Sequence, residues 1–158
     1  MSLPSRPSLL LAACLAAAVP AWAVDTGEAP RSAPVKVDHL ASARAAIEAQ
    51  SWSVALRELD VAARDEPRNA DVQNLLGYTY RKRSSPDLPK AIAHYEAALR
   101  LQPTHRGAHE YIGEAYLMDN KPAEAEKHLA QLEQICGGTG CEEYQDLFKS
   151  IAAYKSSH

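Results

Sequence analysis

Two histidines four residues apart are the arrangement in this sequence that comes nearest to a metal site. His105 and His109 would share one face of a helix, since residues at this spacing are neighbours on a helix surface, and Glu110 follows directly. Imidazole and carboxylate groups are ligands that zinc and other transition metals accept. However, His105 falls at or before the expected start of the helix. We therefore predict no metal and no other cofactor, and keep metal handling through histidines and cysteines as an alternative function.

The two cysteines near the carboxyl end predict a disulfide. Cys136 and Cys141 enclose a short loop that contains three glycines. In an exported chain, two cysteines that close a tight loop are typical of a disulfide, and glycines let the backbone adopt the required turn. The spacing is not the C-x-x-C of redox proteins, nor the C-x-x-C-H of haem attachment. We expect the bond to join the last repeat helix to the helix that follows.

The sequence contains no catalytic motif that we recognise. It has no Gly-x-Ser-x-Gly, no glycine-rich phosphate loop and no His-Glu-x-x-His. The chain carries 17 basic and 20 acidic residues, and no basic run is longer than Arg81-Lys82-Arg83. This balance argues against nucleic acid as the main partner. We predict a non-catalytic protein.

The amino-terminal segment predicts export. An apolar run from Leu9 to Val19 follows Arg6 and ends at Pro20, and Ala21-Trp22-Ala23 has the small-x-small form of a cleavage site. The run is too short to span a bilayer. We therefore predict a signal peptide at residues 1–23, a flexible linker at 24–36 that is rich in proline and small residues, and a periplasmic or secreted mature protein. We expect no transmembrane span.

A lipid anchor is the alternative to simple cleavage. Leu11-Ala12-Ala13-Cys14 fits a bacterial lipobox, in which the cysteine is lipidated and becomes the new amino terminus. The hydrophobic core before Cys14 would then be short, and a second apolar stretch would remain in the mature protein. We therefore favour cleavage near Ala23 over lipidation.

A repeated segment organises the rest of the chain. Leu76-Gly77-Tyr78-Thr79-Tyr80 returns 36 residues later as Ile112-Gly113-Glu114-Ala115-Tyr116. Such self-similarity is typical of stacked helix–turn–helix units. Three units align, at residues 36–69, 70–105 and 106–137. Gly77 and Gly113 would let the second helix of each unit cross closely, and Pro67 and Pro103 would end the first two units.

This pattern resembles the tetratricopeptide repeat over about residues 36–137. The second unit matches most fully, whereas the first has Ala43 in place of the glycine and the third has Gly137 in place of the final proline. The resemblance implies an all-α solenoid of three helix pairs. Residues 138–158 would add the disulfide loop, a short tail and a capping helix. The apolar stripe of that helix consists of Tyr144, Leu147, Phe148, Ile151 and Tyr154.

The resemblance also implies where a partner binds. The first helix of each unit lines the concave groove of such a stack, and an extended peptide and its acidic groups would suit a basic, amide and aromatic middle flanked by apolar ends. Chaperone-binding members clamp a carboxylate with paired lysines and asparagines, and the matching places here hold Leu40, Arg44 and Leu75, so we expect no such clamp. The predicted groove residues are Leu40, Arg44, Ile47, Asn74, Tyr78, Arg81, Lys82, Glu110, Glu114 and Leu117.

The repeat phase also places the other histidines. His109 stands where the family usually has a tryptophan that packs on the preceding unit. His94 and His128 share one phase of the second helix, and we expect both on the outer surface. Together these features predict an exported adaptor that binds a protein or peptide and aids the assembly or maturation of an envelope complex.

Overall fold

The structure, a computed structural model, describes residues 37–158. Within this range the chain is all helical, which confirms the predicted fold class. The predicted signal peptide, the linker at 24–36 and Cys14 lie outside the described residues. In chain order the helices are α1 (His39–Glu48), α2 (Trp52–Asp65), α3 (Ala70–Lys82), α4 (Leu88–Leu101), α5 (Arg106–Met118), α6 (Pro122–Cys136) and α7 (Glu142–Ser157).

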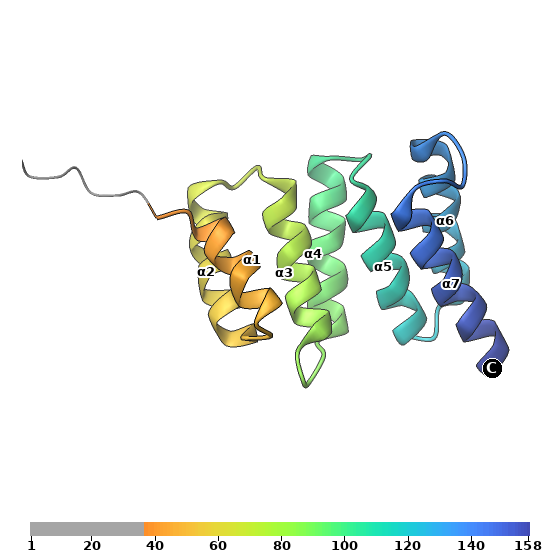
Figure 1. Ribbon diagram of the computed structural model, residues 1–158, viewed down its shortest axis with the longest axis horizontal. Helices are drawn as coiled ribbons and strands as arrows, with labels where there is room; N and C mark the ends of the chain where they lie inside the picture. Colours follow the sequence, from red (N-terminus) through yellow and green to blue (C-terminus); the bar gives the residue numbers. More distant parts are fainter. Residues whose placement is uncertain (1–36) are drawn as a thin grey trace, which may run out of the picture. The chain divides into compact units, whose positions relative to one another are not determined.

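The helices of residues 37–158 form two layers (Figure 1). One layer holds α1, α3, α5 and α7, and the other holds α2, α4 and α6. The pairs α1–α2, α3–α4 and α5–α6 pack most closely, and α7 lies against both α5 and α6. We call the exposed surface of the α1, α3, α5 and α7 layer the groove face, because it carries the predicted groove residues. None of these seven helices combines the length and the apolar character needed to cross a membrane.

Side-chain caps define where several helices begin. Asp38 accepts a hydrogen bond from the Ala41 N–H (2.9 Å) at the start of α1. Asn69 caps α3 through the Asp71 N–H (2.9 Å). Asp87 does the same for α4, directly after the longer turn between α3 and α4. Such caps satisfy amide groups that have no partner within the helix, so they fix the register of each repeat.

The two repeat glycines serve different crossings. A Cβ at Gly77 would lie 2.7 Å from the Tyr95 ring and 2.9 Å from the Ala91 carbonyl oxygen, so this glycine permits α4 to cross α3 as predicted. A Cβ at Gly113 would instead lie 2.7 Å from both terminal carbons of Leu147 in α7. The expectation that Gly113 accommodates its own partner helix α6 was therefore wrong, because the capping helix fills that space.

The capping helix buries a narrower stripe than predicted. Leu147 and Ile151 are buried in the core, and Tyr144 and Tyr154 pack beside them. Phe148 remains 50% exposed and stacks on Tyr144 at 6.2 Å between ring centroids, so its assignment to the buried stripe was wrong. The buried residues recur at three- and four-residue spacing, which turns Phe148 toward the rim of the face.

Cys136 and Cys141 form the predicted disulfide. Gly137 ends α6 in the left-handed conformation (φ 66°), and Gly138 also has a positive φ of 138°. These backbone angles favour glycine, which explains the composition of the loop. The bond connects the last residue of α6 to the residue before α7.

Candidate functional site

The predicted groove residues come together on one layer, but they differ in access. Arg44 and Lys82 are exposed, and most of the others are half-buried. Asn74 and Arg81 are each only 6% exposed, and Leu117 is 8% exposed. These three residues therefore form the floor of the groove face rather than its surface.

Arg81 is held inside the fold by contacts from three helices. Its Nη2 lies 2.7 Å from Glu114 Oε2, and its Nε donates a hydrogen bond to the Tyr95 hydroxyl at 3.2 Å. Its guanidinium also lies 5.6 Å from the ring centroid of Tyr78 and 5.4 Å from that of Tyr111. The expectation that Arg81 attracts an acidic group of a partner was wrong in this respect, because Glu114 already neutralises it. Buried arginines are stable only with such partners.

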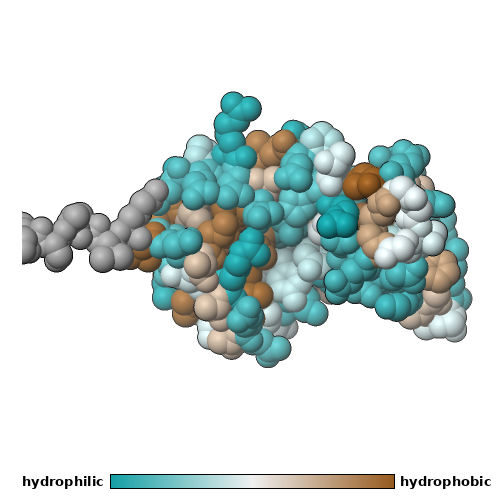
Figure 2. Space-filling model, turned by 45° about the horizontal axis from the view of Figure 1, so that its top comes forward, coloured by the Kyte–Doolittle hydropathy of each residue, from teal (hydrophilic) through white to brown (hydrophobic). Residues whose placement is uncertain are grey.

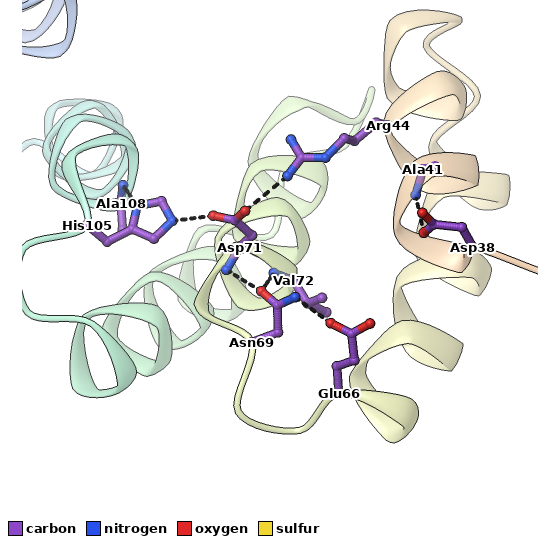
Figure 3. Close-up of polar contacts among 9 residues, drawn as sticks. All are labelled: Asp38, Ala41, Arg44, Glu66, Asn69, Asp71, Val72, His105 and Ala108. Atoms are coloured by element: carbon purple, nitrogen blue, oxygen red, sulfur yellow. Dashed lines mark hydrogen bonds and ion pairs between the residues drawn. The ribbon is translucent and has the colours of Figure 1, made fainter.

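A second polar cluster joins successive repeats at the amino-terminal ends of α3 and α5 (Figure 3). Asp71 in α3 accepts from Arg44 of α1 at 3.2 Å and from His105 Nε2 at 2.9 Å. His105 Nδ1 accepts from the Ala108 N–H at 3.1 Å and so caps α5. His105 is thus used to position helices, and its Nε2 must carry the proton that Asp71 accepts.

The histidines pair differently from the metal arrangement considered above. His109 is buried, and its Nε2 donates to the Pro103 carbonyl at 2.9 Å. Its Nδ1 lies 2.9 Å from Nδ1 of His128 in α6. His105 and His109 therefore face separate partners. Among residues 37–158, one group of three possible metal ligands is compact enough to hold an ion, namely Cys136, Cys141 and Glu143, and its two sulfur atoms are joined in the disulfide.

His94 and His128, which were expected on the outer surface, are only partly exposed, because each packs against neighbouring side chains. His94 is half-buried and stacks on Tyr80, with 5.5 Å between the ring centroids. Its Nδ1 forms a hydrogen bond with Gln73 Oε1 at 2.9 Å. His128 is half-buried between His109 and Tyr116, on whose ring it stacks at 5.8 Å. The family position of His109 indicated packing on the preceding unit, but its pairing with the next helix depends on the crossing of α5 and α6.

The His109–His128 pair predicts a loss of stability in mild acid. Burial lowers the pKa of both rings, and burial with the neighbouring His109 lowers that of His128 to about 4. In the unfolded chain histidine titrates near pH ~6.5. As the pH falls, the unfolded state takes up the proton first, so stability present above that pH is lost between about 6.5 and 4.

Melting temperatures measured from pH 8 to pH 4 would test this prediction. We expect His128→Gln to flatten the decline relative to the wild type, because a neutral amide replaces the group whose protonation is opposed. His158→Gln is the matched control, because His158 is exposed at the end of α7. Equal slopes for the wild type and His128→Gln would contradict the prediction.

One carboxylate of the groove face lacks a partner. Glu110 is half-buried and makes no hydrogen bond or ion pair with another residue of the range 37–158. Burial raises the pKa of Glu110 to about 8, and the negative charges of Glu114, Asp146 and Glu143 add to the rise. Asn74 Oδ1, on the adjacent helix α3, is buried without a hydrogen-bond donor. The sequence indicated both as groove residues, but only the three-dimensional arrangement shows that they lack hydrogen-bond partners.

The groove face is hollowed beside Glu114. A pocket of about 350 Å³ lies between α3, α5 and α7 and has Met118 at its rim, with 46% of that residue exposed. Its lining consists of Arg81, Glu114, Leu117, Met118, Ser150 and Tyr154. Figure 2 shows apolar surface gathered over the α1 to α3 end of the array, crossed by hydrophilic side chains. Leu40, Ile47 and Leu75 pack there against the first core cluster.

Comparison with known proteins supports the repeat assignment. The tetratricopeptide repeat family model matches residues 40–88 and 85–138. These two segments cover more than half of the chain and extend from α1 to the end of α6. No curated protein matches the chain in sequence.

Proposed function

The chain belongs to the tetratricopeptide repeat family, whose helical scaffolds mediate protein–protein interaction, and we propose that it is an exported adaptor that binds an extended segment of a partner protein on its groove face. We further propose that it aids the assembly or maturation of a complex of the cell envelope. Neither of the two helix layers of residues 37–158 carries a catalytic motif that we recognise.

The pocket between α3, α5 and α7 is the observation that carries this proposal. Leu117 and Met118 provide an apolar wall, and Met118 is one of few large apolar side chains that remain exposed in residues 37–158. The Arg81–Glu114 ion pair and Ser150 provide a polar wall, since Ser150 Oγ donates to Glu114 Oε1 at 3.3 Å. A hollow with apolar walls and a few fixed polar groups suits one side chain of a peptide.

Two features support export. The predicted signal peptide at residues 1–23 ends in a small-x-small site. The Cys136–Cys141 disulfide suits an oxidising compartment, where such bonds persist. Mass spectrometry of the mature amino terminus distinguishes cleavage after Ala23 from lipidation of Cys14.

The groove assignment is tested by two surface variants with matched changes. The groove variant combines Lys82→Glu with Met118→Glu, and the control combines Arg100→Glu with Leu101→Glu on α4 of the other layer. All four residues are exposed, so both variants should keep the wild-type circular dichroism spectrum and melting temperature.

The measurement is quantitative capture of partners from a cell-envelope extract on each immobilised protein. We expect specific partners to bind the wild type and the control equally. They should bind the groove variant at least about tenfold less, because it loses both the positive charge of Lys82 and the apolar contact that Met118 would make with a bound partner. Retention of every partner by the groove variant, with loss on the control, would place the binding site on the other layer.

A further inference from the structure

A hollow of about 460 Å³ lies at the end of the array that holds the α1–α2 and α3–α4 turns (Figure 1). This volume falls within the range of about 300–1,000 Å³ that small-molecule sites have. The hollow shares no lining residue with the pocket of the groove face. Its lining comes from two successive repeats and includes Gln50, Ser51, Trp52, Leu56 and the segment 83–85.

One wall of this hollow is built by residues that the repeat itself does not need. The segments that join the helices of the first and third units, 49–51 and 119–121, have three residues each, whereas the α3–α4 segment, 83–87, has five. The longer segment extends beyond the ends of the helices (Figure 1). On the opposite wall Gln50 has a positive φ of 53°, which glycine and asparagine adopt more readily. Such departures from regular packing in loops on a rigid scaffold are typical of binding sites.

Half-buried polar groups on the α2 side of the hollow are left without partners. Ser51 precedes α2 and does not cap it through its side chain. The Trp52 indole N–H makes no hydrogen bond within residues 37–158, and it is accessible, because the buried side-chain atom of that range that lacks a partner is Asn74 Oδ1. An indole N–H usually finds a partner when it is buried. Trp52 therefore presents both a ring and a free donor to the hollow.

Arg83 presents further donors in a fixed position. Its Nε donates a hydrogen bond to the Ser85 carbonyl at 2.6 Å, and its Cζ lies 5.6 Å from the ring centroid of Tyr80. Its two Nη groups make no hydrogen bond or ion pair within residues 37–158. A guanidinium presents these N–H groups as a planar fork, which matches two neighbouring oxygen atoms. The fold thus orders this side chain and leaves its fork available.

We propose that this hollow binds one ring of a saccharide, a function that goes beyond the partner binding of the groove face and does not depend on it. The C–H groups on one face of a sugar ring pack on the negative face of an aromatic ring, and Trp52 beside Leu56 provides such a platform. Sugar hydroxyls both donate and accept hydrogen bonds, so they suit the Ser51 hydroxyl, the Gln50 amide and the Arg83 fork. A purely apolar ligand would leave these polar groups without partners.

Tryptophan fluorescence tests this inference directly. The mature chain proposed above contains a single tryptophan, Trp52, because Trp22 precedes the cleavage site. Tetrasaccharides of glucose, N-acetylglucosamine and galacturonate are titrated into this protein, and sorbitol is the control because it carries similar hydroxyl groups but no ring. We expect at least one tetrasaccharide to change the emission saturably, with a Kd of about 1 mM or lower. Sorbitol should leave the emission unchanged.

Isothermal titration calorimetry with the tetrasaccharide that binds best then compares variants with the wild type. Trp52→Leu and Arg83→Ala should each weaken binding at least about tenfold, because the first removes the platform and the second removes charge-assisted donors. Arg64→Ala is the matched control, because Arg64 is exposed in the last turn of α2, and it should bind like the wild type. Arg83 lies outside the helices, so its replacement should keep the wild-type circular dichroism spectrum even if Trp52→Leu impairs folding.

Three outcomes would overturn the inference while the proposed function stands: no tetrasaccharide binds, sorbitol gives the same response, or Arg83→Ala binds like the wild type. The groove variant with Lys82→Glu and Met118→Glu should bind the tetrasaccharide unchanged, and a loss there would also overturn the inference by placing the sugar on the groove face. A failure of the proposed function looks different. In that case the groove variant keeps every protein partner, while the tetrasaccharide still binds beside Trp52.

Discussion

Replacing Tyr95 with alanine is expected to lower the free energy of unfolding by about 4 kcal/mol, the scale measured when a large buried aromatic ring is removed. Tyr95 is fully buried, and its ring occupies the space that Gly77 leaves on α3. Its hydroxyl accepts a hydrogen bond from Arg81 Nε at 3.2 Å. The substitution therefore removes the packing of the α3–α4 crossing and also leaves a buried donor without an acceptor. Urea unfolding followed by circular dichroism measures the change.

Two further variants separate these contributions. Tyr95→Phe keeps the ring and removes only the acceptor, so we expect a loss of about 1 kcal/mol. Gly77→Ala forces a methyl group against the Tyr95 ring and the Ala91 carbonyl, with an expected loss of about 1 to 3 kcal/mol from overpacking. In a Tyr95→Leu background Gly77→Ala should cost less. A cost below about 1 kcal/mol for Tyr95→Ala itself would contradict the close packing of α3 on α4.

The pairing of the helices was predictable because small and aromatic residues recur in the sequence at the spacing of the repeat. Small residues recur on both helices of a unit, and Gly77 meets Tyr95 and Ala91 of its own unit, so its role follows from the repeat alone. Gly113 has the same position, yet it meets Leu147, which comes from the helix after the last repeat. A repeat pattern describes contacts within the repeating unit and does not include those made by its cap.

The electrostatics of the groove face were less predictable for a related reason. Family position places Arg81, Glu110 and Glu114 on one face, but it does not state which charges cancel. Arg81 is neutralised because Glu114 comes from the next repeat and Tyr95 from the second helix of its own. Glu110 makes no ion pair within residues 37–158, and burial beside Glu114, Asp146 and Glu143 raises its pKa to about 8, so the group is largely uncharged near neutral pH. Sequence therefore identified the surface, whereas the pairing and the charge state of its ionisable groups depended on the packing of three helices.

Replacing Arg81 with methionine is expected to lower the free energy of unfolding by about 3 kcal/mol, the lower end of the range for breaking a buried ion pair. The lower end applies because the Glu114 side chain is 25% exposed, whereas that of Arg81 is 6% exposed. The loss arises mainly because the Glu114 carboxylate loses its cation and keeps only the Ser150 hydroxyl as a donor, and because the Tyr95 hydroxyl loses the donor that it has in Arg81. Equilibrium unfolding in urea at pH 7 measures it.

A double-mutant cycle with Glu114→Gln identifies the origin of that loss. Once the carboxylate has become an amide, Arg81→Met leaves no unpaired charge, so the double variant should be more stable than the two single losses predict by about 1 to 2 kcal/mol. Arg44→Met is the matched control, because Arg44 pairs with Asp71 at the surface with 49% and 53% of the two side chains exposed. Its loss should stay below about 1 kcal/mol. Additive losses at Arg81 and Glu114 would mean that Arg81 is held by the tyrosines rather than by the ion pair.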